Sequence, residues 1–509
     1  MRRAYTVAQV RAAEAALMAT LPDGTLMQRA AAGLAAVCAD VLPSVYGARV
    51  VVLVGSGDNG GDALYAAARL ARRGAAVTAV LLSERAHTGG LASLTAAGGR
   101  VIADLGAEWS ASAWSRRENS DLVIDGITGI GGKGGLREPA VSVVSQLPTT
   151  AHVVAVDLPS GVDATTGQVD GPAVRADVTV TFGALKPGLL IDPAAAYAGH
   201  VVLADIGLDS YLEQPDAEAL QTSDVAALLP EPDRDADKYR RGVVGVLAGS
   251  ARYPGTAVLT TGAALHAGAG YVRVAAGPGT ADAVRRAWPE AVVAAGEDSD
   301  PTAVGRVQAW ATGPGVGTDD DARDRLANVL AADLPTVLDA DALTLLAHDT
   351  GLLGGRSAGT LLTPHAGELA RLLNVDRADV EARRVEHVRV AAERFNATVL
   401  LKGGTTLVAT PGRPTRVNPM GSPWLATAGS GDVLTGLVGS LLAAGLDPRD
   451  AGSLGAWLHG LAARLASAGG PISASDLVPA IAAAYRAVSA TGDMRGVGRP
   501  DEPGDRQHR

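Results

Sequence analysis

A short glycine-rich segment near the C-terminus combines residue types that suit phosphoryl chemistry. Residues 429–431 (Gly-Ser-Gly) precede an apolar stretch that predicts a helix to about Leu442, and Asp432 lies in its first turn. The unpaired N–H groups of a first helical turn bind anions. A carboxylate beside them could take a proton from a group that is about to receive a phosphoryl. The alternative is a capped turn with an acidic residue at its start, which this motif alone would favour.

A second glycine-rich segment lies between an apolar run and a helical pattern in the N-terminal half. Residues 55–62 read Gly-Ser-Gly-Asp-Asn-Gly-Gly-Asp, and Glu84 falls near the end of the next apolar run. The G-x-G-x-x-G spacing is typical of dinucleotide-binding folds, so a dehydrogenase is a competing interpretation. Asp58 and Asp62 count against it, because carboxylates repel a pyrophosphate unless a cation lies between them.

Aspartates end two further predicted strands and adjoin glycine-rich loops. Asp125 precedes the loop 126–134, and Asp157 precedes Leu-Pro-Ser-Gly. One such aspartate is more often a helix cap, but the repeated pattern weakens that explanation. The carboxyl ends of neighbouring parallel strands share one crevice, where oxygen ligands of this type suit a hard cation. We therefore expect five side chains to meet there: Asn59, Asp62, Asp125, Asp157 and Ser160.

Several strand ends in the C-terminal half carry further candidate residues. Lys402 is followed by two glycines and two threonines, a set that suits nucleotide phosphates. Residues 313–317 (Gly-Pro-Gly-Val-Gly) suit close approach of the main chain to a ligand. Residues 338–343 place two acids at one strand end, where one could bind metal or substrate and the other cap a helix. His365 follows another strand, although a lone histidine is more often structural. No G-x-x-x-x-G-K-[ST] motif occurs, which excludes a P-loop enzyme.

Composition limits the class of protein. The chain has 509 residues, a net charge of −10 and 47% hydrophobic residues. The acidic balance argues against a nucleic-acid surface, which requires a basic face. The single cysteine, Cys38, indicates a reducing cytoplasm and is expected to be an inert core thiol. We find no signal-peptide pattern and no apolar run of membrane-spanning length. The abundance of Ala and Gly is compatible with assembly of several copies.

Alternation of short apolar runs with helical patterns predicts an α/β protein of two doubly wound domains with parallel sheets. We place an N-terminal Rossmann-like, three-layer domain at residues 1–212, a polar linker at 213–241, a second domain at 242–494 and a disordered tail at 495–509. The predicted strands of the first domain are 50–54, 76–82, 121–125, 152–157, 178–182 and 201–204. Those of the second are 242–247, 271–275, 309–312, 336–339, 360–363, 398–401 and 406–409.

The N-terminal motifs resemble those of NAD(P)H-hydrate epimerases. The similarity covers residues 5–11, 26–30, 55–62, 125–134 and 157–161. It implies a potassium ion held by Asn59, Asp125 and Ser160. It also implies substrate contacts from Asp58, Asn59, Gly60, Gly61, Asp62, Gly129, Ile130, Gly131, Gly132, Lys133, Gly134, Gly135 and Asp157.

This chain departs from the epimerase pattern at two places. An Asn-Asn pair is usual where Asp58-Asn59 stands, and the loop at 129–132 reads Gly-Ile-Gly-Gly where Gly-Thr-Gly is usual. Asp58 adds negative charge near the phosphates of the substrate, so the resemblance leaves the strength of the epimerase activity open.

The second half resembles ADP-dependent NAD(P)H-hydrate dehydratases, which have a ribokinase-like fold. The similarity spans residues 242–490, with motifs in the family's order. It implies Mg²⁺ with the nucleotide. Thr256 stands where alanine is usual and adds a hydroxyl group, and Thr344 stands where asparagine is common. The resemblance implies nucleotide contacts from Lys402, Gly403, Gly404, Thr405, Thr406 and Gly431. It implies substrate contacts from Thr256, Gly315, His365 and Asp432.

Together the two resemblances imply repair of hydrated NADH and NADPH. The second domain would use ADP to phosphorylate the C6 hydroxyl group and release AMP and phosphate, with Asp432 as general base. The first domain would interconvert the R and S epimers through Asp157 or Asp62, a choice that the sequence leaves open.

Two other classes stay open on the sequence alone. The second domain could be a vitamin or sugar kinase of the same fold, since a fold does not fix the substrate. The first domain could be a non-catalytic ligand-binding module, since a related domain occurs in RNA-decapping scaffolds. The acidic balance and the retained Asn59, Asp125 and Ser160 argue against RNA binding.

Overall fold

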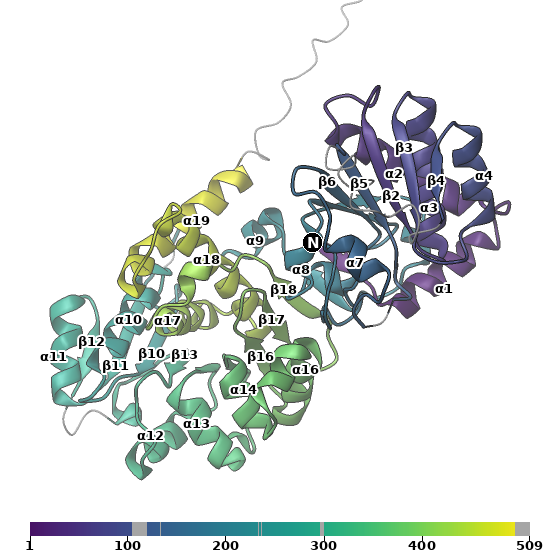
Figure 1. Cartoon of the computed structure of the whole chain (residues 1–509). Helices are drawn as coiled ribbons and strands as arrows, with labels where there is room; N and C mark the ends of the chain where they lie inside the picture. Colours follow the sequence, from purple (N-terminus) through teal and green to yellow (C-terminus); the bar gives the residue numbers. More distant parts are fainter. Residues whose placement is uncertain (104–119, 133, 233, 236, 296–299, 494–509) are drawn as a thin grey trace, which may run out of the picture. The chain divides into compact units, whose positions relative to one another are not determined.

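The computed structural model of the chain describes residues 1–103, 120–132, 134–232, 234–235, 237–295 and 300–493 (Figure 1). The chain divides into two compact units, Arg2–Glu218 and the part from Ala219 onward. The predicted tail 495–509 and Lys133 lie outside the described residues. No helix in the described ranges is long and apolar enough to cross a membrane.

The N-terminal unit is built on a seven-stranded sheet of order β4-β3-β2-β5-β6-β7-β8, in which every neighbouring pair is parallel. The order reverses beside β2, so the loops after β2 and β5 lie at the switch point where doubly wound sheets bind ligands. The strands of the unit are β1 (Arg2–Ala4), β2 (Arg49–Val54), β3 (Ala76–Leu81), β4 (Arg100–Ile102), β5 (Leu122–Gly126), β6 (His152–Val156), β7 (Val178–Phe182) and β8 (His200–Ala204).

Helices cover both faces of this sheet, because successive strand residues point to opposite faces and both sets are apolar. Val50 and Val52 pack with residues of α1 to α4, whereas Val51 and Leu53 pack with α7. Cys38 is buried in the first of these cores, as predicted, and burial raises its pKa to about 12. The helices are α1 (Val7–Met18), α2 (Thr25–Val41), α3 (Asp58–Arg72), α4 (Thr88–Ala96), α7 (Ala140–Val144) and α8 (Ala195–Ala198), with 3-10 turns η1 (Pro187–Leu189) and η2 (Asp209–Tyr211).

The sheet of the C-terminal unit runs in the order β18-β17-β16-β15-β14-β13-β10-β11-β12. The strands from β16 to β12 along this order pair in parallel, whereas β17 pairs antiparallel with both β16 and β18. The strands are β10 (Val243–Leu247), β11 (Tyr271–Ala275), β12 (Val292–Ala294), β13 (Ala309–Thr312), β14 (Thr336–Leu338), β15 (Thr360–Leu362), β16 (Thr398–Leu401), β17 (Thr406–Ala409) and β18 (Thr415–Asn418).

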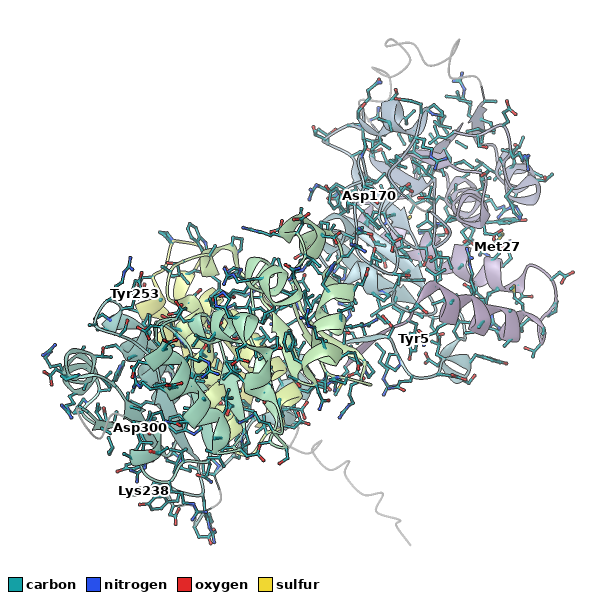
Figure 2. The ribbon with its side chains drawn as sticks, turned by 90° about the horizontal axis from the view of Figure 1, so that it is seen from below. Tyr5, Met27, Asp170, Lys238, Tyr253 and Asp300 are labelled. Atoms are coloured by element: carbon teal, nitrogen blue, oxygen red, sulfur yellow. The ribbon has the colours of Figure 1, made fainter. Side chains whose placement is uncertain are left out.

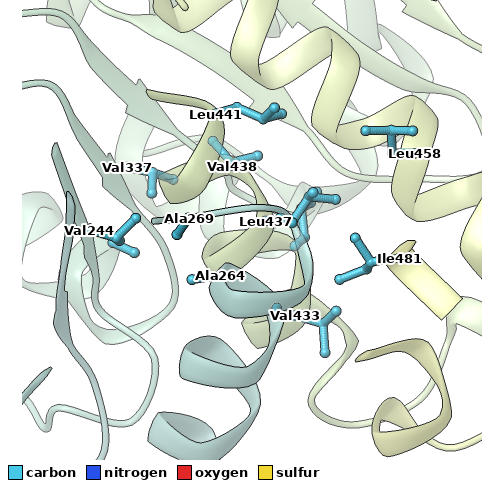
Figure 3. Close-up of a cluster of buried hydrophobic side chains, with 14 of the residues drawn as sticks. Val244, Ala264, Ala269, Val337, Val433, Leu437, Val438, Leu441, Leu458 and Ile481 are labelled. Carbon is cyan, nitrogen blue, oxygen red and sulfur yellow. The ribbon is translucent and has the colours of Figure 1, made fainter. Parts of the chain in front are cut away.

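One face of this sheet carries the largest core, formed with α10, α17, α18 and α19. Val244 and Val337 from the sheet meet Leu437 and Val438 of α17, with Ile481 of α19 beside them (Figure 3). Val329 of α12 contributes to a second core. The helices are α9 (Thr222–Leu228), α10 (Pro254–His266), α11 (Pro278–Ala287), α12 (Asp320–Ala331), α13 (Asp341–His348), α14 (Ala366–Leu373), α15 (Arg377–Ala382), α16 (Arg384–Phe395), α17 (Ser430–Ala443), α18 (Pro448–Ser467) and α19 (Ala474–Asp493), with 3-10 turns η4 (Pro301–Ala303), η5 (Thr350–Leu353) and η6 (Pro423–Leu425).

The predicted α/β class and parallel sheets are confirmed, and each predicted strand is present with ends that differ by at most one residue. Short elements were missed. The stretch predicted as a polar linker contains β9 (Ala217–Ala219) and α9, in which only Val225 is fully buried in the core. A helix with so few apolar residues gives no clear periodic signal.

Candidate active sites of the two units

The N-terminal unit contains a cavity of about 760 Å³ at the carboxyl ends of β2, β5 and β6. Met27, labelled in Figure 2, lies on α2 and lines it, as do Arg11 and Glu14 of α1. Of the predicted substrate residues, the lining includes Asp58, Asn59, Asp62, Gly129, Ile130, Gly131, Gly132 and Asp157. The structure therefore brings the first glycine loop, the second glycine loop and the end of β6 to one chamber.

Not every predicted substrate residue reaches this cavity. Gly60 and Gly61 are buried in the first turn of α3, and neither lines the chamber. A Cβ atom at Gly60 would lie 2.4 Å from the carbonyl oxygen of Gly55, so only glycine fits the close contact between this helix and the preceding loop. Gly134 and Gly135 also lie outside the lining. Their expected substrate contacts stay predictions.

Asp157 follows β6 in a strained main-chain conformation, with φ of +64°. Its Oδ1 atom accepts hydrogen bonds from Lys186 Nζ at 2.5 Å, from Thr181 Oγ1 at 3.0 Å and from the N–H of Phe182 at 3.3 Å. Non-glycine residues with a positive φ are concentrated at functional sites, where the surrounding structure holds this conformation. The β7 strand and the segment after it thus fix the orientation of the Asp157 carboxylate.

Asp62 lies in the first turns of α3 and is also buried. Its Oδ1 atom is buried without a hydrogen-bond partner. Burial raises the pKa of Asp62 well above its usual value, and the negative charges of Asp157, Asp58 and Glu14 raise it further. The two carboxyl groups proposed from the sequence therefore differ in environment: Asp157 has a cationic partner and Asp62 has acidic neighbours.

Asn59, Asp125 and Ser160 meet beside the cavity. Ser160 donates from Oγ to Asp125 Oδ1 at 2.6 Å and from its N–H to Oδ2 at 2.8 Å. Asn59 Nδ2 donates to the carbonyl of Thr128 at 3.1 Å, and the N–H of Thr128 donates to Ser160 Oγ at 2.9 Å. Burial raises the pKa of Asp125 to about 6 although these hydrogen bonds oppose the shift. This fully buried carboxyl group has hydrogen-bond donors but no cationic side chain among its recorded partners.

In the C-terminal unit, α17 places Asp432 near an ion pair between the partly exposed Lys402 and the buried Asp339. Gly429 caps the helix with φ of +88°, and Asp432 lies in its first turn. Lys402 Nζ lies 2.7 Å from Asp339 Oδ1, while Thr435 Oγ1 donates to Asp339 Oδ2 at 2.9 Å. A Cβ atom at Gly431 would lie 3.3 Å from Asp339 Oδ2 and 3.5 Å from Lys402 Nζ. The first turn of α17 therefore faces the Lys402–Asp339 pair.

The charges around Asp432 set its proton affinity. Burial raises its pKa to about 7, Asp339 and Asp341 raise it, and Lys402 lowers it. Burial acts to lower the pKa of Lys402, but Asp339 and Glu368 raise it above its usual value, so this lysine stays charged. Asp432 is thus a carboxyl group that changes protonation near neutral pH, which suits a general base.

We expect ADP-dependent dehydration to depend on pH through Asp432. A general base acts as the carboxylate, so kcat should rise about tenfold per pH unit below a midpoint near 7 and level off above it. The measurement is a profile of kcat from pH 5 to 9 at saturating nucleotide. A rate that is flat through this range would contradict the assignment of the base.

His365 occupies a structural position at the start of α14. Its Nδ1 atom accepts from the N–H groups of Gly367 at 3.0 Å and Glu368 at 3.3 Å, so it caps this helix. Glu368 in return accepts from the N–H of His365 at 2.8 Å. Because Nδ1 is an acceptor, only Nε2 is left for a ligand, at a side chain that is 56% exposed. The predicted substrate contact of His365 stays a prediction, to be made through Nε2.

The other predicted residues of this unit surround the same edge of the sheet. Thr256 Oγ1 lies 2.9 Å from the carbonyl of Tyr253 and 3.0 Å from that of Pro314, which ties the start of α10 to the loop that contains Gly315. Tyr253, labelled in Figure 2, is half-exposed beside this loop. Gly403, Gly404 and Thr405 form the turn between β16 and β17, and Thr406 begins β17.

Two site residues were not assigned roles from the sequence. Lys186 lies four residues after β7, and its partner Asp157 is 29 residues away in sequence. A lysine after a predicted strand end was the available signal, since that strand ends at the same edge as the aspartates. Asp339 was one of two acids left as alternatives. The structure makes it the partner of Lys402, while Asp341 Oδ2 accepts from the N–H of Gly317 at 3.0 Å.

Comparison with known proteins gives the family. A family model described as NAD(P)H-hydrate dehydratase matches residues 244–481, and one described as YjeF-related protein N-terminus matches residues 23–188. The bifunctional NAD(P)H-hydrate repair enzyme Nnr of Mycobacterium leprae is 49% identical over 499 residues, which cover 96% of this chain and 100% of that protein. The chain belongs to the bifunctional NAD(P)H-hydrate repair enzymes.

A second member of this repair-enzyme family is similarly close, and a more distant dehydratase structure resembles the C-terminal half. The bifunctional NAD(P)H-hydrate repair enzyme Nnr of Mycobacterium tuberculosis H37Rv is 50% identical over 458 residues, covering 89% of this chain and 91% of that protein. A crystal structure of ADP/ATP-dependent NAD(P)H-hydrate dehydratase from Bacillus subtilis, co-crystallised with ATP and Mg²⁺, is 29% identical, with a TM-score of 0.49. It covers 53% of this chain and 97% of that chain. The family predicted from both sets of motifs is confirmed.

Proposed function

We propose that this repair-family enzyme converts both epimers of hydrated NADH and NADPH back to the reduced cofactors. The N-terminal unit interconverts the R and S forms at C6, and the C-terminal unit dehydrates the S form with ADP, which yields AMP and phosphate. The placement of Asp432 in the first turn of α17, beside the Lys402–Asp339 pair, carries this proposal. A dehydrogenase would have no use for a general base at a phosphate-binding helix terminus.

The dehydration can be derived from the residues of the C-terminal site. Asp432 takes the proton of the C6 hydroxyl group, whose oxygen attacks the terminal phosphoryl group of ADP. The N–H groups at the start of α17 and the ammonium group of Lys402 stabilise the negative charge on the transferring phosphoryl. Phosphate then leaves C6, a proton leaves C5, and the C5=C6 double bond of the dihydropyridine forms.

Mg²⁺ fits this site as a companion of the nucleotide. Within the described ranges, no group of three or more His, Cys, Asp or Glu side chains is arranged to hold a metal ion. Mg²⁺ is commonly held by one or two carboxylates together with substrate phosphates, and Asp339 is such a carboxylate near Asp432. Bound there, it would neutralise charge on the phosphates during transfer.

A potassium ion fits the cluster formed by Asn59, Asp125 and Ser160. Amide, carboxylate and hydroxyl oxygens are ligands for hard cations, and a fully buried carboxyl group is costly to ionise without an opposite charge. The cation would compensate Asp125 and hold the loops after β2, β5 and β6 around the substrate.

Removal of potassium is therefore expected to lower epimerisation and spare dehydration. We predict a loss of about tenfold or more in epimerisation when K⁺ is replaced by tetramethylammonium at equal ionic strength, within the range seen when metal-site groups are disturbed. Epimer ratios are followed by chromatography without ADP, and dehydration of purified S epimer is the control. Equal epimerisation in both salts would contradict the potassium site.

The kinase alternative differs from this proposal in its product. Purified S epimer and ADP should give AMP, phosphate and dihydronicotinamide in equal amounts, with no stable phosphorylated product. Accumulation of a phosphorylated compound without dihydronicotinamide would support the kinase instead. Hydrated NADH or NADPH and ADP are the expected small-molecule partners, with no nucleic acid. A cytoplasmic location and assembly of copies stay predictions.

A further inference from the structure

Among the described residues of the N-terminal unit, Lys186 is the most deeply buried cationic side chain. It is 1% exposed, and its Nζ lies 2.5 Å from Asp157 Oδ1, 3.0 Å from Thr181 Oγ1 and 3.3 Å from the carbonyl of Phe182. These contacts account for the three donors of an ammonium group. A charge buried so completely is stable only when it is paired and hydrogen-bonded. Lys186 therefore depends on an ionised Asp157, and the converse also holds.

The pairing leaves one oxygen of Asp157 available to the cavity. All recorded hydrogen bonds to this carboxyl group, from Lys186, Thr181 and Phe182, go to Oδ1. Asp157 lines the cavity, so Oδ2 can accept a proton or a hydrogen bond from a ligand there. Lys186 does not line the cavity and acts on the ligand only through Asp157.

Asp62 provides the opposite protonation state in the same chamber. Its Oδ1 atom is buried without a partner, and burial together with Asp157, Asp58 and Glu14 raises its pKa. A neutral carboxyl group is the form that such surroundings favour. The charged or titratable groups that face this pair or line the chamber are Arg11 and Glu14 of α1, Asp23, Asp58 of α3, His87 before α4, and Lys186 behind Asp157.

We propose that Lys186 is a positioning residue that holds Asp157 as a carboxylate opposite a protonated Asp62, so that one cavity contains both a base and an acid for epimerisation. This inference rests on the epimerase activity proposed above. Two carboxyl groups with environments that separate their proton affinities are a common basis for acid and base roles.

With Asp62 as the acid and Asp157 as the base, the two residues account for epimerisation at C6. Asp62 donates a proton to the hydroxyl group, the C6–O bond breaks, and water leaves while the N1 lone pair forms an N1=C6 double bond. Water then attacks C6 from the other face and Asp157 accepts its proton. The ring is neither oxidised nor reduced. Transfer of one proton from Asp157 back to Asp62, through water, restores the starting enzyme.

The test compares Lys186→Met, which removes the charge, with Thr181→Val, which removes one hydrogen bond to the same carboxylate oxygen. Conversion of pure R to S epimer is measured without ADP, from pH 5 to 9. In Lys186→Met we expect epimerisation to fall by about 10²-fold at pH 7, and the rising limb of kcat/KM to move at least about one unit to higher pH, because Asp157 loses the charge that keeps it ionised. Thr181→Val should leave the limb within about half a unit of wild type.

The dehydratase activity of the same chain is the internal control for folding. If Lys186→Met also loses dehydration of S epimer, Lys186→Gln, which keeps hydrogen-bond donors without the charge, replaces it in the comparison. The inference would be overturned if the active uncharged variant shows the rising limb of its kcat/KM profile at the same pH as the wild type. Absence of epimerisation by the wild-type chain, with dehydration intact, would instead overturn the proposed epimerase function.

Discussion

Asp432→Asn is expected to abolish ADP-dependent dehydration, with a loss in kcat of about 10³-fold, within the range that general bases contribute. The substitution keeps the shape of the side chain at the start of α17 and removes only its ability to accept a proton. Burial raises the pKa of Asp432 to about 7, so the wild-type group is poised to do so near neutral pH. The rate is measured with purified S epimer, saturating ADP and Mg²⁺, from the recovery of near-UV absorbance.

Asp341→Asn is the matched control for this variant. Asp341 is near Asp432 but its Oδ2 atom accepts from the N–H of Gly317, so it is not free to act as the base. We expect it to retain activity within about tenfold of wild type. Nucleotide affinity of Asp432→Asn, measured by calorimetry, should be nearly unchanged. Normal turnover in Asp432→Asn would refute the assignment of the base.

Asp157→Asn is expected to remove epimerisation while it spares dehydration. The amide cannot accept a proton at neutral pH and leaves Lys186 without its carboxylate, so conversion of R to S should fall by at least about 10²-fold. The measurement uses pure R epimer with ADP, where the variant should recover dihydronicotinamide no faster than spontaneous epimerisation allows. The S epimer should be dehydrated at the wild-type rate.

Asp163→Asn controls for changes near the end of β6. Asp163 Oδ1 accepts from the N–H groups of Thr165 and Thr166 and does not line the cavity, so its loss should leave epimerisation within about threefold of wild type. Equal loss of both activities in Asp157→Asn would indicate structural damage. In that case Asp157→Ala, which also removes the carboxylate, should lose both activities as well.

The sequence was sufficient for most of the fold because its strong signals are local. The predicted strands of both sheets are largely apolar runs, several of which end beside a glycine or an aspartate, and burial on both faces leaves few polar residues within them. The strands β4 and β12 were missed because each is short and lies partly exposed at the end of its sheet. The strands β14 and β15 are equally short, but they are fully buried and lie within longer apolar runs.

The candidate sites were predictable only in part, because the local sequence does not show which distant residues pair. Strand-end position identified Asp157, Asp125 and Lys402 from the sequence. Whether Asp339 or Asp341 would pair with Lys402 depended on the direction of one side chain after β14. The role of Lys186 required the fold, since the segment after β7 turns inward to Asp157.

A single mixture shows whether one chain repairs both epimers. Purified protein is mixed with both epimers of hydrated NADH, ADP, Mg²⁺ and K⁺, and near-UV absorbance of dihydronicotinamide is followed to completion. We expect complete recovery, faster than spontaneous epimerisation permits. Recovery that stops when the S epimer is consumed would refute the proposed epimerase activity, and no recovery at all would refute both proposed activities.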